Sequence, residues 1–286
     1  MVSNLDSKNY YVKHFNNFDD YLNCKDSVFD EEIIEIDNFS DDDIFNSKTE
    51  GFLYIPNYIQ YMRRSASFDE ILSEMSKNKI KKIKKGKKEI ERFKILIEEN
   101  LTKNSFEDFY KLYLKRVDEK ENGIVSCREN WFEIDIEKSK KIGIFVYDCE
   151  KLIAGIVARS FNAGEILPRR MSISYSALDS EYRNLGINDY LNVLMIDLVN
   201  KLGFEYVFRG MDTNLYGKHL NVGIPVFKRS FGYKIVENKL KPRVLIKFNN
   251  LENFSDEIKF FSFDESENLV ENIIENEKKI KYVNYE

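Results

Sequence analysis

Cysteine and histidine are scarce in this chain. Its 286 residues include three cysteines, Cys24, Cys127 and Cys149, and two histidines, His14 and His219. The cysteines lie far apart, are odd in number and form no CxxC pair, which is typical of reduced cytoplasmic thiols and not of a disulfide framework. No cluster of histidine, cysteine and carboxylate has the spacing of a metal site, so the sequence predicts no bound metal.

Long apolar runs and a strong excess of one charge are absent as well. No run approaches the ~18 apolar residues of a membrane span, and the first residues lack the basic and apolar regions of a signal peptide. Lys and Arg number 44 and Asp and Glu number 49, which gives a net charge of -5. This balance excludes a global basic field for nucleic acid but allows a local patch. We therefore expect a cytoplasmic protein without a membrane span, whose oligomeric state the sequence leaves open.

The apolar pattern between residues 141 and 236 predicts strands and helices in succession. Residues 143–158 form two β-rich runs around a polar turn, the pattern of a hairpin. Residues 171–178 alternate as a strand, residues 188–202 carry apolar side chains on one helical face, and residues 204–208 read as a buried strand. With 43% hydrophobic residues, the chain is long enough for one large or two ordinary domains.

A lysine-rich helix is expected in the segment Lys77–Lys88, after a capping-box pattern at Ser67-Phe-Asp-Glu70. Ile80 and Ile83 form a thin apolar stripe, lysines cover the other faces, and Gly86 is expected to end or kink the helix. Like charges four residues apart cost stability, which suggests a polyanionic partner such as a nucleotide, a tRNA or a phosphorylated substrate. A solvated surface is the plainer alternative. The lysines expected to contact the polyanion are Lys81, Lys82, Lys84 and Lys85.

A glycine-containing turn, Arg183-Asn-Leu-Gly186-Ile-Asn188, stands where an expected strand gives way to a helix. Backbone N–H groups at such a place can hold a phosphate or pyrophosphate. Asn188 can cap the helix. The alternative is a turn that binds no ligand. A family resemblance, given below with its motifs, implies that the residues in contact with the phosphates are Arg183, Asn184, Leu185, Gly186, Ile187 and Asn188.

Three further segments carry predictions. Phe227 and Phe231, four residues apart, are expected to anchor a short helix in the core and to leave Lys228 on another face. Segment 209–219 is polar directly after a buried strand, where ligands of α/β sheets often bind. Residues 249–286 are acidic and amphipathic, which predicts a C-terminal helix or a loosely ordered tail.

The order strand, hairpin, strand, loop, helix, strand resembles the fold of the GNAT superfamily. Two motifs are similar to those of the branch with the Fem-type peptidyltransferases and the BioF2-like acetyltransferase domains. They are Ser67-Phe-Asp-Glu-Ile-Leu72 followed by the lysine-rich helix, and Phe227-Lys228-x-x-Phe231-Gly232. The turn shares Arg183 and Gly186 with the GNAT pattern R/Q-x-x-G-x-G/A, whereas Asn188 replaces its small residue.

The resemblance covers roughly residues 50–248. It implies an α+β fold, with a mixed, mostly antiparallel sheet flanked by helices. An abbreviated, pseudo-GNAT half with the lysine-rich helix is expected in residues 1–104, and an acyltransferase domain in residues 105–248. Residues 249–286 follow as the C-terminal segment.

The resemblance also implies site roles. The donor's phosphates would face the backbone N–H groups of the turn, and Lys228 would stabilise the negative charge that develops on the acyl carbonyl. Transfer needs a base for the acceptor amine, for which Asp212 and His219 are candidates, and Tyr216 can donate a proton to the departing thiolate. No Ser-His-Asp or Cys-His pattern is visible, so direct attack is expected.

Three functions remain open at this point. The first is an N-acyltransferase that moves an acyl group from acyl-CoA, or from the thioester of a carrier protein, to an amine on a small molecule or peptide. The second is a Fem-type transferase with aminoacyl-tRNA as the donor, which the lysine-rich helix favours. The third is a non-catalytic binding protein on the same fold, which the departure at Asn188 permits.

Overall fold

The contacts divide the chain into two compact units, which are described separately. The first comprises Met1–Gln60, Met211–Pro225 and Ile235–Glu286, and the second comprises Tyr61–Gly210 and Val226–Lys234. This division differs from the boundaries near residues 104 and 248 that the sequence suggested. The computed structural model describes residues 12–24, 33–40, 42–43, 51–56, 58–119, 125, 127–134, 139–161, 169–213, 227–237, 243–248, 258–263, 269–274 and 280–283.

The first unit contains a four-stranded sheet and a short helix. In the sheet order β1-β2-β11-β3, β1 and β2 are parallel and β11 is antiparallel to both of its neighbours. Helix α1 (Phe18–Cys24) follows the first strand directly. An aromatic cluster forms the core, with the Tyr21 ring 4.9 Å from that of Phe52. The strands are β1 (Val12–Asn17), β2 (Ile33–Asn38), β3 (Leu53–Pro56) and β11 (Arg243–Phe248).

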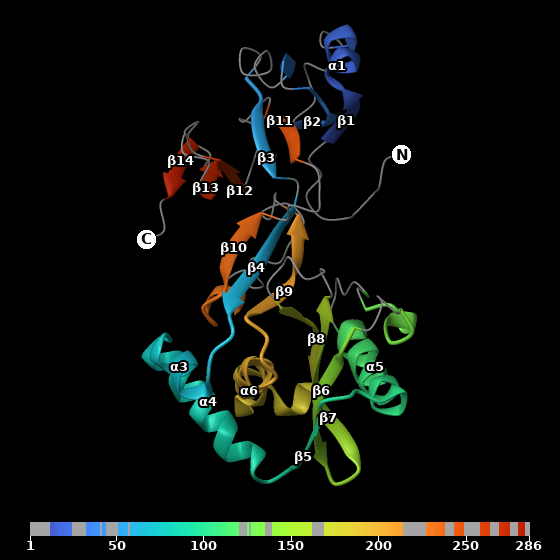
Figure 1. Cartoon of the computed structure of the whole chain (residues 1–286), viewed down its shortest axis with the longest axis vertical. Helices are drawn as coiled ribbons and strands as arrows, with labels where there is room; N and C mark the ends of the chain where they lie inside the picture. The colour runs from blue at the N-terminus through green and yellow to red at the C-terminus, as the bar shows by residue number, and fades with distance from the viewer. Residues whose placement is uncertain are drawn as a thin grey trace. The chain divides into compact units, whose positions relative to one another are not determined.

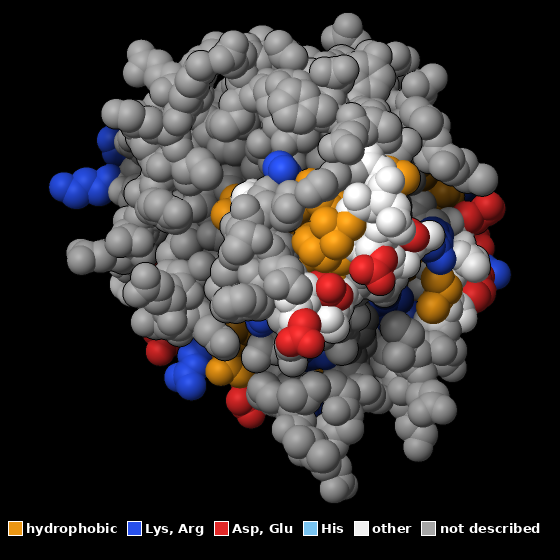
Figure 2. All heavy atoms as spheres, turned by 90° about the horizontal axis from the view of Figure 1, so that it is seen from above, with side chains coloured by type: hydrophobic (Ala, Val, Ile, Leu, Met, Phe, Trp, Pro, Cys, Tyr) orange, Lys and Arg blue, Asp and Glu red, His pale blue; other side chains and the backbone are white. Residues whose placement is uncertain are grey.

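Acidic and hydrophobic side chains are exposed on the described part of this unit. Helix α1 exposes Asp19, Asp20 and Leu22. On the face seen in Figure 2, acidic side chains lie beside hydrophobic ones.

The C-terminal segment forms strands. β12 (Ile258–Phe263), β13 (Leu269–Ile274) and β14 (Ile280–Val283) make an antiparallel three-stranded sheet. The expected C-terminal helix is therefore wrong for these residues. Their sequences are rich in isoleucine, valine and phenylalanine, which favour a pleated sheet over a helix.

The second unit is built on a mostly antiparallel sheet, as the sequence led us to expect. The sheet has seven strands in the order β10-β4-β9-β8-β7-β6-β5, of which β5 to β8 lie wholly within this unit. β5 to β8 pair antiparallel in succession, whereas β8 and β9 are parallel. The strands are β4 (Tyr58–Arg64), β5 (Lys94–Glu98), β6 (Lys141–Asp148), β7 (Lys151–Phe161), β8 (Arg170–Leu178), β9 (Tyr206–Thr213) and β10 (Lys234–Glu237).

Helices cover both faces of this sheet (Figure 1). α5 (Lys103–Asp118) packs Phe106 and Phe109 against the sheet, together with the short 3₁₀ helix η2 (Glu129–Trp131). α6 (Ile187–Lys201) lies on the opposite face and contacts α3 (Phe68–Ser73) and α4 (Lys77–Ile90). None of the helices in the described ranges is long and apolar enough to cross a membrane.

The capping box ahead of α3 is confirmed. The Glu70 carboxylate accepts the Ser67 backbone N–H at 2.8 Å. The next N–H, that of Phe68, donates to Asp197 of α6 at 3.0 Å. The start of α3 is thereby fixed to α6, which is the first step in placing α4 beside it.

Gly86 neither ends nor kinks α4, and that expectation is wrong. The helix continues to Ile90, and a Cβ atom added to Gly86 would lie 2.2 Å from the backbone oxygen of Gly186. Conversely, a Cβ atom on Gly186 would lie 2.4 Å from the backbone oxygen of Lys82. Real Cβ atoms do not approach backbone so closely, so two glycines are needed for α4 to touch the start of α6.

Candidate active site

The glycine turn has the geometry of a helix start. It comprises the 3₁₀ helix η3 (Ser180–Leu185) and then Gly186, which has φ +78° and is the N-cap of α6. The first helical hydrogen bond runs from the Tyr190 N–H to the Gly186 carbonyl, at 3.1 Å. Asn188 is therefore not the cap but lies in the first turn, where its carbonyl accepts the Asn192 amide at 2.7 Å. The N–H groups of this first turn have no partner within the helix and point toward its N-terminal end.

The lysine-rich helix lies directly against this turn. The Lys85 ammonium donates to the carbonyl oxygen of Asn184 at 2.8 Å, and Lys79 forms an ion pair of 2.5 Å with Asp189. Together with the contact between Gly86 and Gly186, these bonds join two motifs that lie a hundred residues apart in the sequence. The expected polyanion site and the expected phosphate site are thus one continuous surface.

Lys79 is a contact that sequence reasoning missed. Its ammonium lies 3.7 Å from the ring centroid of Phe231 and 5.0 Å from that of Phe227. Burial lowers the pKa of Lys79, and the hydrogen bond to Asp189 opposes that shift. Lys79 therefore connects α4, the start of α6 and the FKxxFG motif. The spacing of Lys79 could have indicated this position. Lys79 stands four residues before Ile83 and seven before Gly86, so it shares the buried face of α4 with them.

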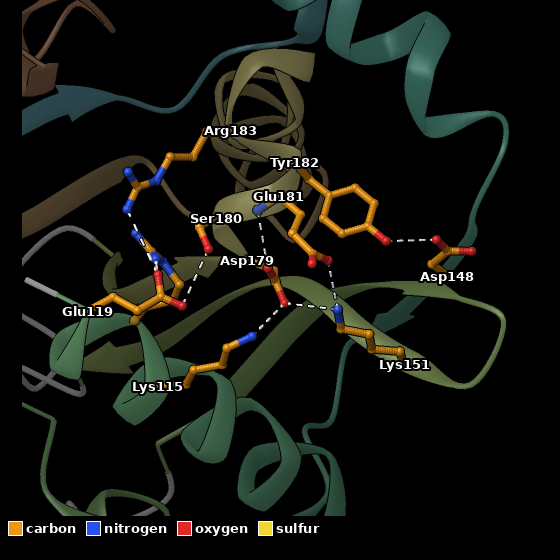
Figure 3. A network of polar contacts seen from close by, with 10 residues as sticks. Lys115, Glu119, Asp148, Lys151, Asp179, Ser180, Glu181, Tyr182 and Arg183 are labelled. Carbon is orange, nitrogen blue, oxygen red and sulfur yellow. Dashed lines mark hydrogen bonds and ion pairs between the residues drawn. The ribbon is translucent and has the colours of Figure 1, made fainter.

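The other cations of the surface face solvent. The side chains of Lys81, Lys82, Lys84 and Lys85 are exposed. Arg183 is also exposed, and its guanidinium lies 3.9 Å from the Glu119 carboxylate (Figure 3). These groups can approach a large or flexible anion without losing their hydration.

Asp179 is the N-cap residue of η3 and holds the start of the turn in place through its carboxylate (Figure 3). Its carboxylate is buried, accepts the Glu181 N–H at 3.2 Å, and pairs with Lys115 at 3.1 Å and Lys151 at 3.2 Å. Burial raises the pKa of Asp179, but these hydrogen bonds outweigh it and hold the pKa below its usual range. A cleft of about 330 Å³ lies alongside, and its lining includes Asp179 and both lysines. Because these charges pair with one another, we assign the cluster to support of the turn.

A second region lies where β8 and β9 stop pairing, which we call the fork. The parallel pairing extends only from Arg170 to Ser172 on β8, although both strands continue. Between β7 and β8 the register also shifts, which leaves Ser174 as an extra residue. Beyond the last pair, the Arg209 guanidinium donates to the hydroxyl of Ser176 at 2.9 Å and so bridges the two strands. Bulges and strand separations of this kind often accompany active sites, because they release backbone groups from the ladder.

Lys228 reaches the fork from the FKxxFG motif. Residues 227–229 form a short helical turn, and the rings of Phe227 and Phe231 meet edge-on, 5.0 Å apart. Lys228 is only 8% exposed, so it is not a surface lysine. Its ammonium lies 4.1 Å from the ring centroid of Tyr61 and 3.8 Å from where a Cβ atom on Gly210 would be. A positive charge is thereby held beside β9, just beyond its last pair with β8.

The remaining predicted residues are not tested by the structure. Asp212 lies on β9, but its side chain is outside the described residues, and so are Tyr216 and His219. Sequence reasoning did not assign a role to Arg63 or Arg209, which are both buried. A single arginine within a strand gives no sequence signal of its burial, so the sequence pattern did not indicate Arg209. In the described part of the chain, no group of His, Cys, Asp and Glu could hold a metal ion.

Comparison with known proteins bears on the fold. No protein-family model matches the chain, and neither does any curated protein. Among solved structures, the chain is similar to FemX, with a TM-score of 0.51 and 14% identity over 81% of this chain and 76% of that one. It is also similar to L-PGS from Bacillus licheniformis, with a TM-score of 0.44 and 12% identity over 81% of this chain and 72% of that one. The likeness to FemX shows a shared GNAT-type fold, as the sequence led us to expect.

Proposed function

We propose that this GNAT-fold chain is an N-acyltransferase, with acyl-CoA or the thioester of a carrier protein as its donor. The observation that carries the proposal is the burial of Lys228 at the fork, where a carbonyl group placed between the separated strands would meet its ammonium. An amine of a small molecule or peptide is the acceptor. These donors are cytoplasmic, which supports a cytoplasmic location.

The reaction proceeds by direct attack. The acceptor nitrogen forms a bond to the thioester carbon, the carbonyl oxygen becomes an oxyanion, and the carbon–sulfur bond then breaks. The amine loses one proton and the departing thiolate gains one. Lys228 stabilises the oxyanion, and it does so strongly because a buried charge is poorly screened. We propose Asp212 or His219 as the base for the amine and Tyr216 as the proton donor to the thiolate.

The donor's pyrophosphate would lie on the first-turn N–H groups of α6, with Arg183 in support. Calorimetry with acetyl-CoA tests this assignment. We expect micromolar affinity, about tenfold weaker in Arg183→Ala, because a charge-assisted hydrogen bond contributes roughly 1.5 kcal/mol. Arg92→Ala is the matched control, since Arg92 is exposed and pairs with Glu89 on a neighbouring turn. Millimolar binding that Arg183→Ala leaves unchanged would rule out the CoA donor.

A second candidate keeps the fold and changes the donor to aminoacyl-tRNA. The contact between Lys85 and Asn184 favours it, because it places the exposed lysines of α4 beside the turn where the donor would bind. A tRNA extends beyond the space that a pyrophosphate needs, and it can use all four lysines at once. This candidate predicts affinity for tRNA that falls steeply as salt rises.

A further inference from the structure

The guanidinium of Arg209 is buried without an acid to pair with in the described ranges. The residue is 9% exposed, one amino group donates to Ser176, and the other has no hydrogen-bond partner among the described residues. Burial lowers the pKa of Arg209, and the opposing influence comes from Tyr233. A buried charge costs several kcal/mol when no counter-ion meets it. Among the described residues, the guanidinium therefore keeps an amino group with no acceptor at the fork.

Tyr233 adds a second buried donor to the same place. The residue is 4% exposed, and its hydroxyl has no hydrogen-bond partner among the described residues. Burial raises the pKa of Tyr233 to about 12, although Arg209 and Arg63 oppose the shift, so the hydroxyl keeps its proton. Arg63, in contrast, is satisfied: it pairs with Glu74 at 3.0 Å and donates to the carbonyl of Phe231.

We propose that Arg209, Ser176 and Tyr233 form a binding site for a carboxylate on a substrate of the transferase. The inference rests on the proposed function, since it names the class of molecule on which that site acts. A guanidinium offers two parallel N–H groups that match the two oxygens of a carboxylate, and the hydroxyls of Ser176 and Tyr233 can each add a hydrogen bond. The carboxylate belongs either to an amino-acid acceptor or to the acyl chain of the donor.

Thermal unfolding of the full chain tests the site without any assay of transfer. We expect 10 mM succinate to raise the midpoint by about 2–4 °C relative to succinamide, its neutral analogue. Arg209→Met should abolish this response and raise the midpoint of the free protein, because it removes an uncompensated buried charge. Arg64→Met, at an exposed position of β4, should leave the succinate response intact. Should Arg209→Met not fold, Arg209→Lys replaces it, because lysine keeps the charge but loses the paired donors.

The proposal is overturned if succinate has no effect on the wild type and Arg209→Met lowers the midpoint, as a structural arginine satisfied by buried water would require. It is also overturned if only Asp212→Asn acquires a succinate response, because Asp212 would then be the internal counter-ion.

Two kinetic comparisons identify the source of the carboxylate. On the donor side, succinyl-CoA is compared with valeryl-CoA, and on the acceptor side, L-alanine with L-alaninamide. We expect at least a tenfold preference in kcat/KM for the carboxylate in one of the two comparisons, and its loss in Arg209→Met. Transfer without any preference would refute the carboxylate site and leave the proposed function standing. No transfer with any pair, together with an intact succinate response, would refute transfer from acyl-CoA to an amino acid and leave the carboxylate site standing.

Discussion

Two groups of cations in the second unit differ in what surrounds them. The exposed lysines Lys81, Lys82, Lys84 and Lys85 stand on α4 beside the glycine turn, whereas Arg209 and Lys228 are buried at the fork. Exposed charges tolerate many binding geometries, and salt screens their attraction to a ligand. Buried charges cost desolvation and act on one defined group. The difference indicates that the exposed lysines suit an extended polyanion, and that the buried pair suits a single carboxylate or oxyanion.

The link between the two groups is the contact of α4 with the start of α6, and Gly86→Val should break it. The added side chain would collide with the Gly186 backbone, at 2.2 Å for its Cβ atom alone. We expect a loss of about 3 kcal/mol in the free energy of unfolding, measured by urea denaturation, because overpacking against backbone cannot relax easily. Lys82→Val, an exposed position on the same helix, is the control and should change stability by less than about 1 kcal/mol. Equal effects of the two variants would contradict the close contact.

Charge reversal of the four exposed lysines to glutamate tests the first group alone. If tRNA is the donor, its affinity at low salt should fall about a hundredfold and its salt dependence should become shallower, since fewer counterions are released. Filter binding at several salt concentrations measures both quantities. Reversing four exposed lysines on other elements, Lys94, Lys103, Lys201 and Lys234, is the control, because it changes the net charge equally and leaves α4 intact. An unchanged salt slope would remove the polyanion from the proposal.

Lys228→Met tests the second group alone. The variant keeps the volume of the side chain and removes its charge, so the fold should persist while kcat falls at least about tenfold, equivalent to roughly 1.4 kcal/mol of barrier. Steady-state kinetics measures the loss, and Lys234→Met, at an exposed position nearby, should be near wild type. A normal turnover number in Lys228→Met would exclude Lys228 from the reaction and would favour the binding-protein alternative.

The smallest effect is expected at Asp179, which supports the turn without touching either group. Its pKa is lowered in the folded chain, so its contribution to stability is present above the unfolded pKa and is lost as the pH falls through the folded pKa. Asp179→Asn should therefore be less stable than wild type near pH 7, by about 1 kcal/mol or less because its lysine partners are half exposed, and the gap should close below about pH 4. Urea midpoints between pH 3 and 7 measure it, with Asp108→Asn as an exposed control. A gap that persists at low pH would show that the carboxylate charge is not the cause.

Local sequence patterns predicted most of the second unit. The capping box predicted the start of α3, hydrophobic periodicity predicted α6, and the two β-rich runs around a polar turn predicted the hairpin of β6 and β7. These patterns depend on residues close together in the sequence, so they can be recognised without knowledge of the fold. The C-terminal strands were misjudged, because short amphipathic runs fit a helix or a strand until a partner strand decides.

The site was predicted unevenly for a related reason. The turn at Gly186 and the FKxxFG motif are short patterns that the sequence itself contains. Their resemblance to motifs of the GNAT superfamily and its Fem-type branch predicted a role for Lys228. The buried pairing of Lys79 with Asp189 was not visible, since the two stand 110 residues apart and Lys79 is one of many lysines. Arg209 was equally hidden, because a single arginine in a strand carries no signal until its burial is known.

By itself, the sequence determined the GNAT-type order of elements, the run of lysines and the presence of a lysine in the FKxxFG motif. Periodicity, capping and composition act over a few residues, and they suffice for these features. Only the tertiary structure decided which cations are hydrated and which are buried, and that Gly86 serves a contact with Gly186 instead of a helix end. The reason is that desolvation and close packing depend on neighbours that the chain brings together only when it folds.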